Sequence, residues 1–151
     1  METIATQLPG RLGDPEMCLG TDPRADARLV EGMTPYGMHL NAPASPVTST
    51  SPLEERLAIT AATEQALQSF FPTLTADLAD VTGVARSVET IEGVAGNAIT
   101  LYVHRPEHTT GAVPAILHIH GGGMGLLTAA DLQFVRWRDE LASRGVLVVG
   151  V

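Results

Sequence analysis

The chain has 151 residues, 44% of them hydrophobic and 17% charged, and a formal net charge of −8. This composition predicts a globular domain with a core and excludes an intrinsically disordered chain. The acidic balance argues against nucleic acid or an anionic membrane as a partner, because both require a basic surface.

Cysteine content and the first residues bear on the cellular location. Cys18 is the one cysteine, so no intramolecular disulfide can form, and nothing in the sequence activates its thiol as a nucleophile. The start of the chain lacks the basic patch and apolar run of a secretory signal. No window approaches the roughly 18 consecutive apolar residues of a membrane span. The expected location is therefore the cytoplasm.

Helix and loop signals fill the first half of the chain. Asp22 as N-cap and Pro23 at the first helical position predict a short helix that stops near Gly32. Residues 34–52 are rich in proline, serine and threonine. They predict either a linker or a loop lying over a pocket, and both interpretations stay open.

A capping box marks the next helix. Ser51 is the predicted N-cap, Pro52 occupies the first helical position, and Glu54 follows three residues after the cap. The apolar pattern then predicts a helix over residues 53–71. Pro72 lies beyond its end, because a proline interrupts helical hydrogen bonding.

From residue 84 on, the hydrophobic period changes from that of helices to that of strands. Before this point, residues 74–83 predict one further short helix that ends at a glycine. β-Branched and aromatic residues then indicate strands, and one amphipathic segment indicates a helix. The predicted strands cover residues 84–91, 98–104, 115–119 and 146–151, and the predicted helix covers residues 131–143.

Two of these strands, 115–119 and 146–151, are apolar on both faces. Such strands are typical of a parallel sheet covered by helices on both sides. The helix 131–143 can cover one face only, because the crossover has a fixed hand. The sequence therefore predicts an α/β fold that exposes an apolar strand edge unless a further segment or a second chain completes the sheet.

The most informative motif is PAILHIHGGGMG, residues 114–125, in which an apolar strand ends in His120 and three glycines follow. Glycine allows the backbone to bend sharply and to approach a ligand closely. Fixed backbone N–H groups stabilise the negative oxygen of a tetrahedral intermediate. An HGGG segment after a strand is the oxyanion-hole motif of α/β-hydrolase esterases and lipases.

This motif, with the helix and strand that follow it, resembles the hormone-sensitive-lipase-like family of α/β-hydrolases over residues 84–151. The resemblance implies the N-terminal part of an α/β-hydrolase fold, incomplete without its C-terminal half. Residues 1–83 would form a helical cap segment, and residues 84–151 the first strands and first crossover helix of a mostly parallel sheet.

The same resemblance implies roles for the residues of the motif. Gly122 and Gly123 would donate their N–H groups to the oxyanion, with His120 and Gly121 supporting the loop. Met124 stands where the family often has a large residue beside the acyl pocket. No cofactor and no metal ion are implied.

The family's nucleophile lies in a Gly-x-Ser-x-Gly elbow, and no serine here has those flanking glycines. The serines are Ser45, Ser49, Ser51, Ser69, Ser87 and Ser143. The resemblance thus implies a piece of a serine carboxylesterase for short- to medium-chain esters, inactive alone. The C-terminal half, in the same or a separate chain, would carry the Ser/Asp/His triad, and a homo-oligomer of the complete enzyme is left open. The alternative is a non-catalytic structural partner chain of a larger assembly.

Other interpretations of the glycines and histidines are weaker. A dinucleotide-binding motif requires glycine where Leu126 or Thr128 stands, and no Gly-Lys-Ser/Thr follows to make a phosphate-binding loop. A metal pair of His118 and His120 lacks a third ligand. Three further histidines are expected at the surface, and Trp137 is expected in the core. Those histidines are His39, His104 and His108.

Overall fold

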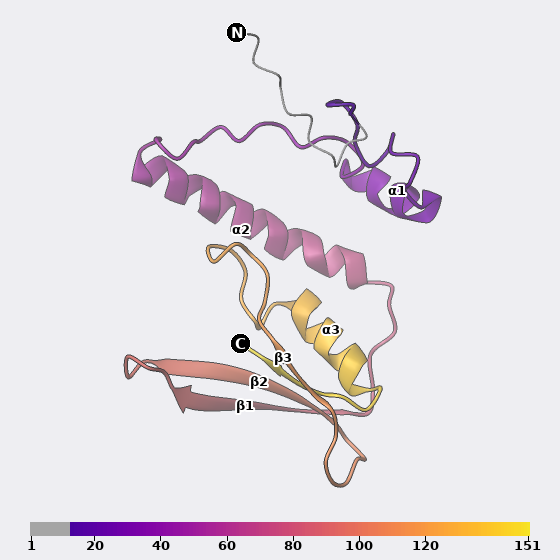
Figure 1. The fold of residues 1–151 in the computed structure, drawn as a ribbon, viewed down its shortest axis with the longest axis vertical. Helices are drawn as coiled ribbons and strands as arrows, with labels where there is room; N and C mark the ends of the chain where they lie inside the picture. Colours follow the sequence, from indigo (N-terminus) through magenta and orange to yellow (C-terminus); the bar gives the residue numbers. More distant parts are fainter. Residues whose placement is uncertain (1–12) are drawn as a thin grey trace. The chain divides into compact units, whose positions relative to one another are not determined.

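The computed structural model describes residues 13–151, which belong to two compact units, Met1–Thr48 and Ser49–Val151 (Figure 1). Residues 1–12, the start of the predicted cap segment, lie outside the described part. The long helix α2 belongs to the same compact unit as the sheet. The division into a cap segment and a core at residue 83 stays a prediction.

The first unit holds helix α1, Ala27–Met33, followed by the short 3₁₀ helix η2, Thr34–Tyr36. The predicted start at Asp22 is wrong, because the side chain of Asp26 caps α1 by accepting from the N–H of Arg28 at 2.9 Å. Asp22 makes the same contact with the N–H of Arg24, also at 2.9 Å, in a turn. Two successive Asp-x-Arg segments thus carry the same local signal, and only the second is followed by a helix.

Helix α2, Leu53–Thr75, is longer than predicted. Pro52 occupies the N-cap position that the capping box assigned to Ser51, so that assignment is wrong. Pro72 lies inside the helix, and residues 73–75 continue it in place of the separate short helix predicted there. At Pro72 the helix packs near α3, where both line one cavity. This packing offsets the hydrogen bond that a proline cannot donate.

The predicted strands and the last helix are confirmed, with ends shifted by one or two residues. The strands are β1, Val84–Glu92, β2, Ala98–Pro106, β3, Ala115–His118, and β4, Leu147–Gly150, and helix α3 spans Leu132–Ala142. They form one sheet of order β1-β2-β4-β3. The α/β class is confirmed. The sheet is parallel only between β3 and β4, and β1–β2 and β2–β4 are antiparallel. The tight turn at residues 93–97 makes β1 and β2 a hairpin, which must be antiparallel.

Strand β3 lies at one edge of the four-stranded sheet. It is one of the two apolar strands, and the sequence predicted that an apolar strand edge would be exposed. Its side chains are largely open, with Leu117 exposed to 65% and the following Ile119 to 74%. Helix α3 packs against β2 and β4. The sheet therefore presents an unpaired, apolar edge at the end that leads into the glycine motif.

A charged network fills the space between α3 and the sheet. Arg138 and Asp139 on α3 and His104 on β2 are exposed to only 0%, 2% and 3%. Arg138 Nε–H donates to His104 Nε2 at 2.9 Å, and His104 Nδ1 lies 2.8 Å from a carboxylate oxygen of Asp139. Because Nε2 accepts, the ring proton is on Nδ1 and His104 is neutral. The prediction of a surface position for His104 is wrong, since this residue of β2 faces α3.

The network extends to the other strands. Arg86 on β1 donates to both carboxylate oxygens of Asp139, with Nε at 2.9 Å. Arg138 also approaches His118 Nδ1 on β3 at 3.3 Å. On β4, a Cβ added to Gly150 would lie 2.6 Å from Arg138 Nη1, so any side chain there would displace the guanidinium. One ionic cluster thus contacts all four strands.

Removing the charge of Asp139 should destabilise the chain strongly. Asp139→Asn removes the carboxylate that binds His104 and Arg86 and that compensates the charge of the buried Arg138 across the cluster. Leaving a buried charge uncompensated costs about 3–5 kcal/mol. Urea unfolding of the purified variant measures the change. The matched control is Glu140→Gln on the same helix, whose partners Arg136 and Arg144 are solvent-accessible, and it should change stability far less. Equal effects of the two variants would contradict the structural role given to Asp139.

Stability should also fall below neutral pH. Burial lowers the pKa of His104 below 6.5. The hydrogen bond to Asp139 raises this pKa, and the positive charge of Arg138 lowers it further. Burial likewise lowers the pKa of His118. The unfolded chain therefore binds more protons than the folded chain, so this stability is complete above the ordinary histidine pKa and is lost as the pH falls through it. Urea unfolding between about pH 7.5 and about pH 5.5 should show the fall.

Two histidine substitutions test the origin of this pH dependence, one in the buried cluster and one at the surface as a control. His104→Gln should flatten the fall, whereas His108→Gln, at an exposed side chain, should leave it unchanged. The same slope in wild type and His104→Gln would contradict the assignment of a buried neutral imidazole.

Candidate functional site: the glycine loop

The glycine loop, residues 119–131, joins β3 to α3 and contains the HGGG motif. A tight turn begins at Gly122, whose carbonyl oxygen accepts from the N–H of Gly125 at 3.2 Å and of Leu126 at 3.0 Å. Gly122 has φ 132° and Gly123 has φ 60°. A Cβ at Gly122 would lie 1.8 Å from the carbonyl oxygen of Leu126. No residue other than glycine fits at position 122 in this conformation.

The turn leaves a run of backbone donors open. The N–H of His120 reaches the carbonyl oxygen of Val151 at 3.4 Å, and the N–H groups from Gly125 to Thr128 are all bonded. Within residues 13–151, nothing accepts from the N–H groups of Gly121, Gly122, Gly123 or Met124. Four consecutive donors are therefore available to a ligand.

The two histidines of the motif are engaged differently. His120 Nδ1–H donates to the carbonyl oxygen of Gly121 at 2.7 Å, next to the open donors. The ring of His118 lies against Trp137 and Phe134, with ring centroids 4.7 and 5.6 Å away. Trp137, expected in the core, is exposed to 45% and packs over His118 on one side. In the described part of the chain, no group of three His, Cys, Asp or Glu is arranged to hold a metal ion.

Met124 carries its side chain fully into solvent and has φ 60°, an uncommon backbone conformation for a residue with a Cβ. It follows Gly123 directly, so its side chain borders the open donors. Its predicted place beside an acyl pocket stays a prediction.

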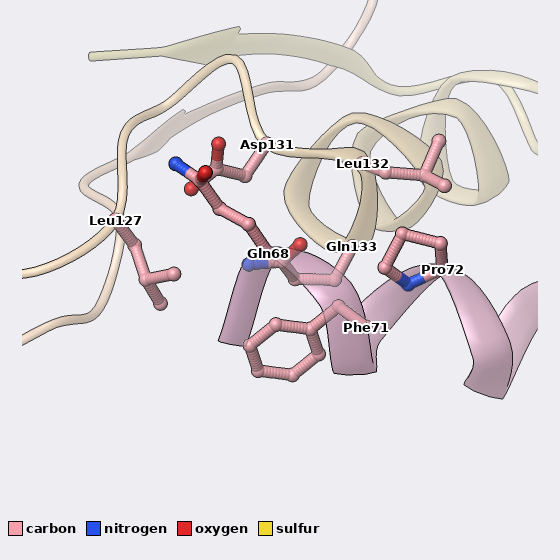
Figure 2. A pocket seen from close by; sticks show the side chains of 7 residues that line it. All are labelled: Gln68, Phe71, Pro72, Leu127, Asp131, Leu132 and Gln133. Atoms are coloured by element: carbon pink, nitrogen blue, oxygen red, sulfur yellow. The ribbon is translucent and has the colours of Figure 1, made fainter. Parts of the chain in front are cut away.

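The second half of the loop is fastened at three points. The N–H of Leu127 donates to Glu64 on α2 at 2.6 Å, and the N–H of Thr128 donates to the carboxylate of Asp131 at 2.8 Å. The carbonyl oxygen of Ala129 accepts from Arg138. Leu127 and Asp131 also line a cavity of about 70 Å³. Figure 2 shows Leu127 on the loop, with the other lining side chains coming from α2 and from the start of α3. The loop is thus bound to α2 as well as to the core.

These supporting residues are not among those predicted from the sequence. Arg138 and Asp139 fall on the same helical stripe as the apolar Phe134, Val135 and Ala142. A charged pair on the apolar face of a helix is a sign of a buried ionic pair, so this signal was available. Glu64 and Leu127 are 63 residues apart, and nothing in the sequence around either residue indicates their contact.

Solved structures of other proteins resemble this chain. No family model and no curated protein sequence matches the chain. A solved structure does: brefeldin A esterase, described as a bacterial homologue of human hormone-sensitive lipase, is 38% identical, with a TM-score of 0.82 over 95% of this chain. The chain belongs to the hormone-sensitive-lipase-like family of α/β-hydrolases.

Further solved esterases share the fold of this chain. The esterase Est22 matches at 23% identity and a TM-score of 0.68 over 89% of the chain, which shows the same fold. A bacterial heroin esterase matches at 26% identity and a TM-score of 0.53 over 62% of the chain. The chain spans 40% of brefeldin A esterase, 39% of Est22 and 29% of the heroin esterase. The family resemblance inferred from the glycine motif is confirmed, for a part of such an enzyme.

Proposed function

We propose that this hydrolase-family chain supplies the oxyanion hole and part of the cap of a serine carboxylesterase. The observation that supports it best is the run of open N–H groups in a glycine turn that tolerates no side chain at Gly122. Backbone donors fixed before the reaction stabilise developing negative charge without reorganisation. The solved structures named above are esterases.

In the proposed reaction, a serine attacks the carbonyl carbon of a short- or medium-chain ester, and a histidine takes the proton of its hydroxyl group. The carbonyl oxygen becomes an oxyanion that accepts from the N–H groups of Gly122 and Gly123. The histidine then protonates the leaving alcohol, and water releases the acid from the acyl-enzyme. His120 and Gly121 support the loop, and Met124 borders the acyl group.

The proposal requires a further segment with the nucleophile, because none of the six serines lies in a Gly-x-Ser-x-Gly elbow. We expect that segment to continue the sheet at the free edge of β3, where apolar side chains are exposed. We call this chain together with that segment, in one or two polypeptides, the complete protein. None of the helices within residues 13–151 is both long and apolar enough to cross a membrane, and a cytoplasmic location is part of the proposal.

A non-catalytic partner chain is the second candidate, and ester hydrolysis separates the two. The complete protein should hydrolyse p-nitrophenyl acetate or butyrate. Gly122→Ala should lower kcat by about 100- to 1,000-fold, since the added Cβ collides with the carbonyl oxygen of Leu126 and displaces the donors. Gly125→Ala is the matched control and should retain activity, because the nearest atom to its added Cβ is 4.0 Å away.

Two results would contradict the proposal. Absence of ester hydrolysis by a folded complete protein would favour the structural partner. Full activity of Gly122→Ala would show that the glycine turn does not supply the oxyanion donors. Circular dichroism and thermal unfolding of each variant check that it is folded.

A further inference from the structure

We propose that Glu64 is a positioning residue for the glycine loop, whose carboxylate on α2 holds the N–H of Leu127 and so ties the open donors to that helix. This inference rests on the proposed function, because it gives Glu64 a part in presenting the oxyanion donors. The N–H of Leu127 lies 2.6 Å from Glu64 Oε2, in a partly buried contact. A carboxylate accepts from a backbone N–H more strongly than a neutral oxygen does.

The carboxylate of Glu64 is itself held in place. Its other oxygen, Oε1, accepts from the side-chain amide of Gln68 at 3.0 Å, one turn further along α2. Glu64 is half-buried, whereas Gln68 is exposed. Both oxygens therefore have a partner, and the side chain is oriented toward the loop before any ligand binds.

The loop needs an external acceptor at this position. Leu127 has φ 65°, in the left-handed region that is unfavourable for a residue with a Cβ. Such a conformation persists only where surrounding contacts hold it. The N–H of the adjacent Leu126 closes the turn onto Gly122 at 3.0 Å. Fixing the peptide at Leu127 thereby fixes the turn that presents Gly122 and Gly123.

Helix α2 also contacts the loop through apolar atoms. Leu127 lines the cavity of about 70 Å³ with Phe71 and Pro72, both on α2 (Figure 2). The following anchors, from Asp131 and Arg138, belong to the start and the buried face of α3. Residue 127 is thus the point where the loop passes from the support of α2 to that of the core. A displacement of α2 would therefore move the backbone at Leu127 directly.

Hydrogen exchange of backbone amides tests the anchor without any need for catalysis. In the ¹⁵N-labelled chain, Glu64→Ala should speed exchange at Leu127 by about tenfold or more. Glu64→Gln should give an intermediate rate, because its amide oxygen still accepts but carries no charge. Gln65→Ala, the exposed neighbour on α2, should leave the rate unchanged. Amides of β4 serve as reference and should not change, which distinguishes positioning from general destabilisation.

Kinetics of the complete protein test the consequence. Glu64→Ala should lower kcat for a p-nitrophenyl ester about tenfold with little change in KM, since the oxyanion contacts form in the transition state. Glu64→Gln should restore part of the loss. Unchanged exchange at Leu127 in Glu64→Ala, or faster exchange with unaltered kcat, would overturn the inference. If the wild type hydrolyses no ester, the proposed function fails, and the exchange result alone decides whether Glu64 anchors the loop.

Discussion

The guanidinium of Arg138 is the interaction on which the fold of the second unit depends. It is fully buried and bonds to His104 on β2, to His118 on β3 and to the carbonyl oxygen of Ala129 in the glycine loop. A buried cation is tolerated only with a compensating charge and satisfied donors. Asp139 provides the charge, and Arg86 on β1 shares that carboxylate. Sheet, helix and loop are therefore fixed relative to one another by one cluster.

The glycine loop illustrates how a strained backbone is kept ready for a ligand. Gly122, Gly123, Met124 and Leu127 all have positive φ, and for the two that carry a Cβ the left-handed conformation costs about 1–2 kcal/mol each. Three fixed points oppose relaxation, namely Glu64, Asp131 and Arg138. The donors at Gly121 to Met124 thus stay unbonded while the residues after them are held. A loop organised in this way loses little free energy to reorganisation when an anion binds.

Much of the fold could be predicted, because the signals are local. Apolar runs placed β3 and β4, the turn at residues 93–97 separated β1 from β2, and the stripe of apolar residues marked α3. The glycine motif identified the family and the candidate loop. Two failures concern helix ends. Asp22 and Asp26 carry the same local signal, and the sequence alone does not separate them. Pro72 ends the predicted helix, whereas the structure continues the helix through it, beside α3.

Charged side chains were the hardest residues to place. His104 reads as a surface residue at the end of a strand, and its burial depends on Arg138 and Asp139, which come 34 and 35 residues later. Glu64 is one of several acidic residues on α2, and nothing nearby distinguishes it. The partners of these residues lie far away in the sequence and come together only when the chain folds, so the neighbouring residues do not reveal them.

The central claim is that the N–H groups of Gly122 and Gly123 receive the oxyanion. The most direct measurement is a structure of the complete protein after reaction with a p-nitrophenyl phosphonate, whose phosphonyl oxygen imitates the oxyanion of the tetrahedral intermediate. The account predicts that oxygen within about 2.7–3.1 Å of both nitrogen atoms. A phosphonyl oxygen bound by other donors, with Gly122 and Gly123 still open, would contradict it.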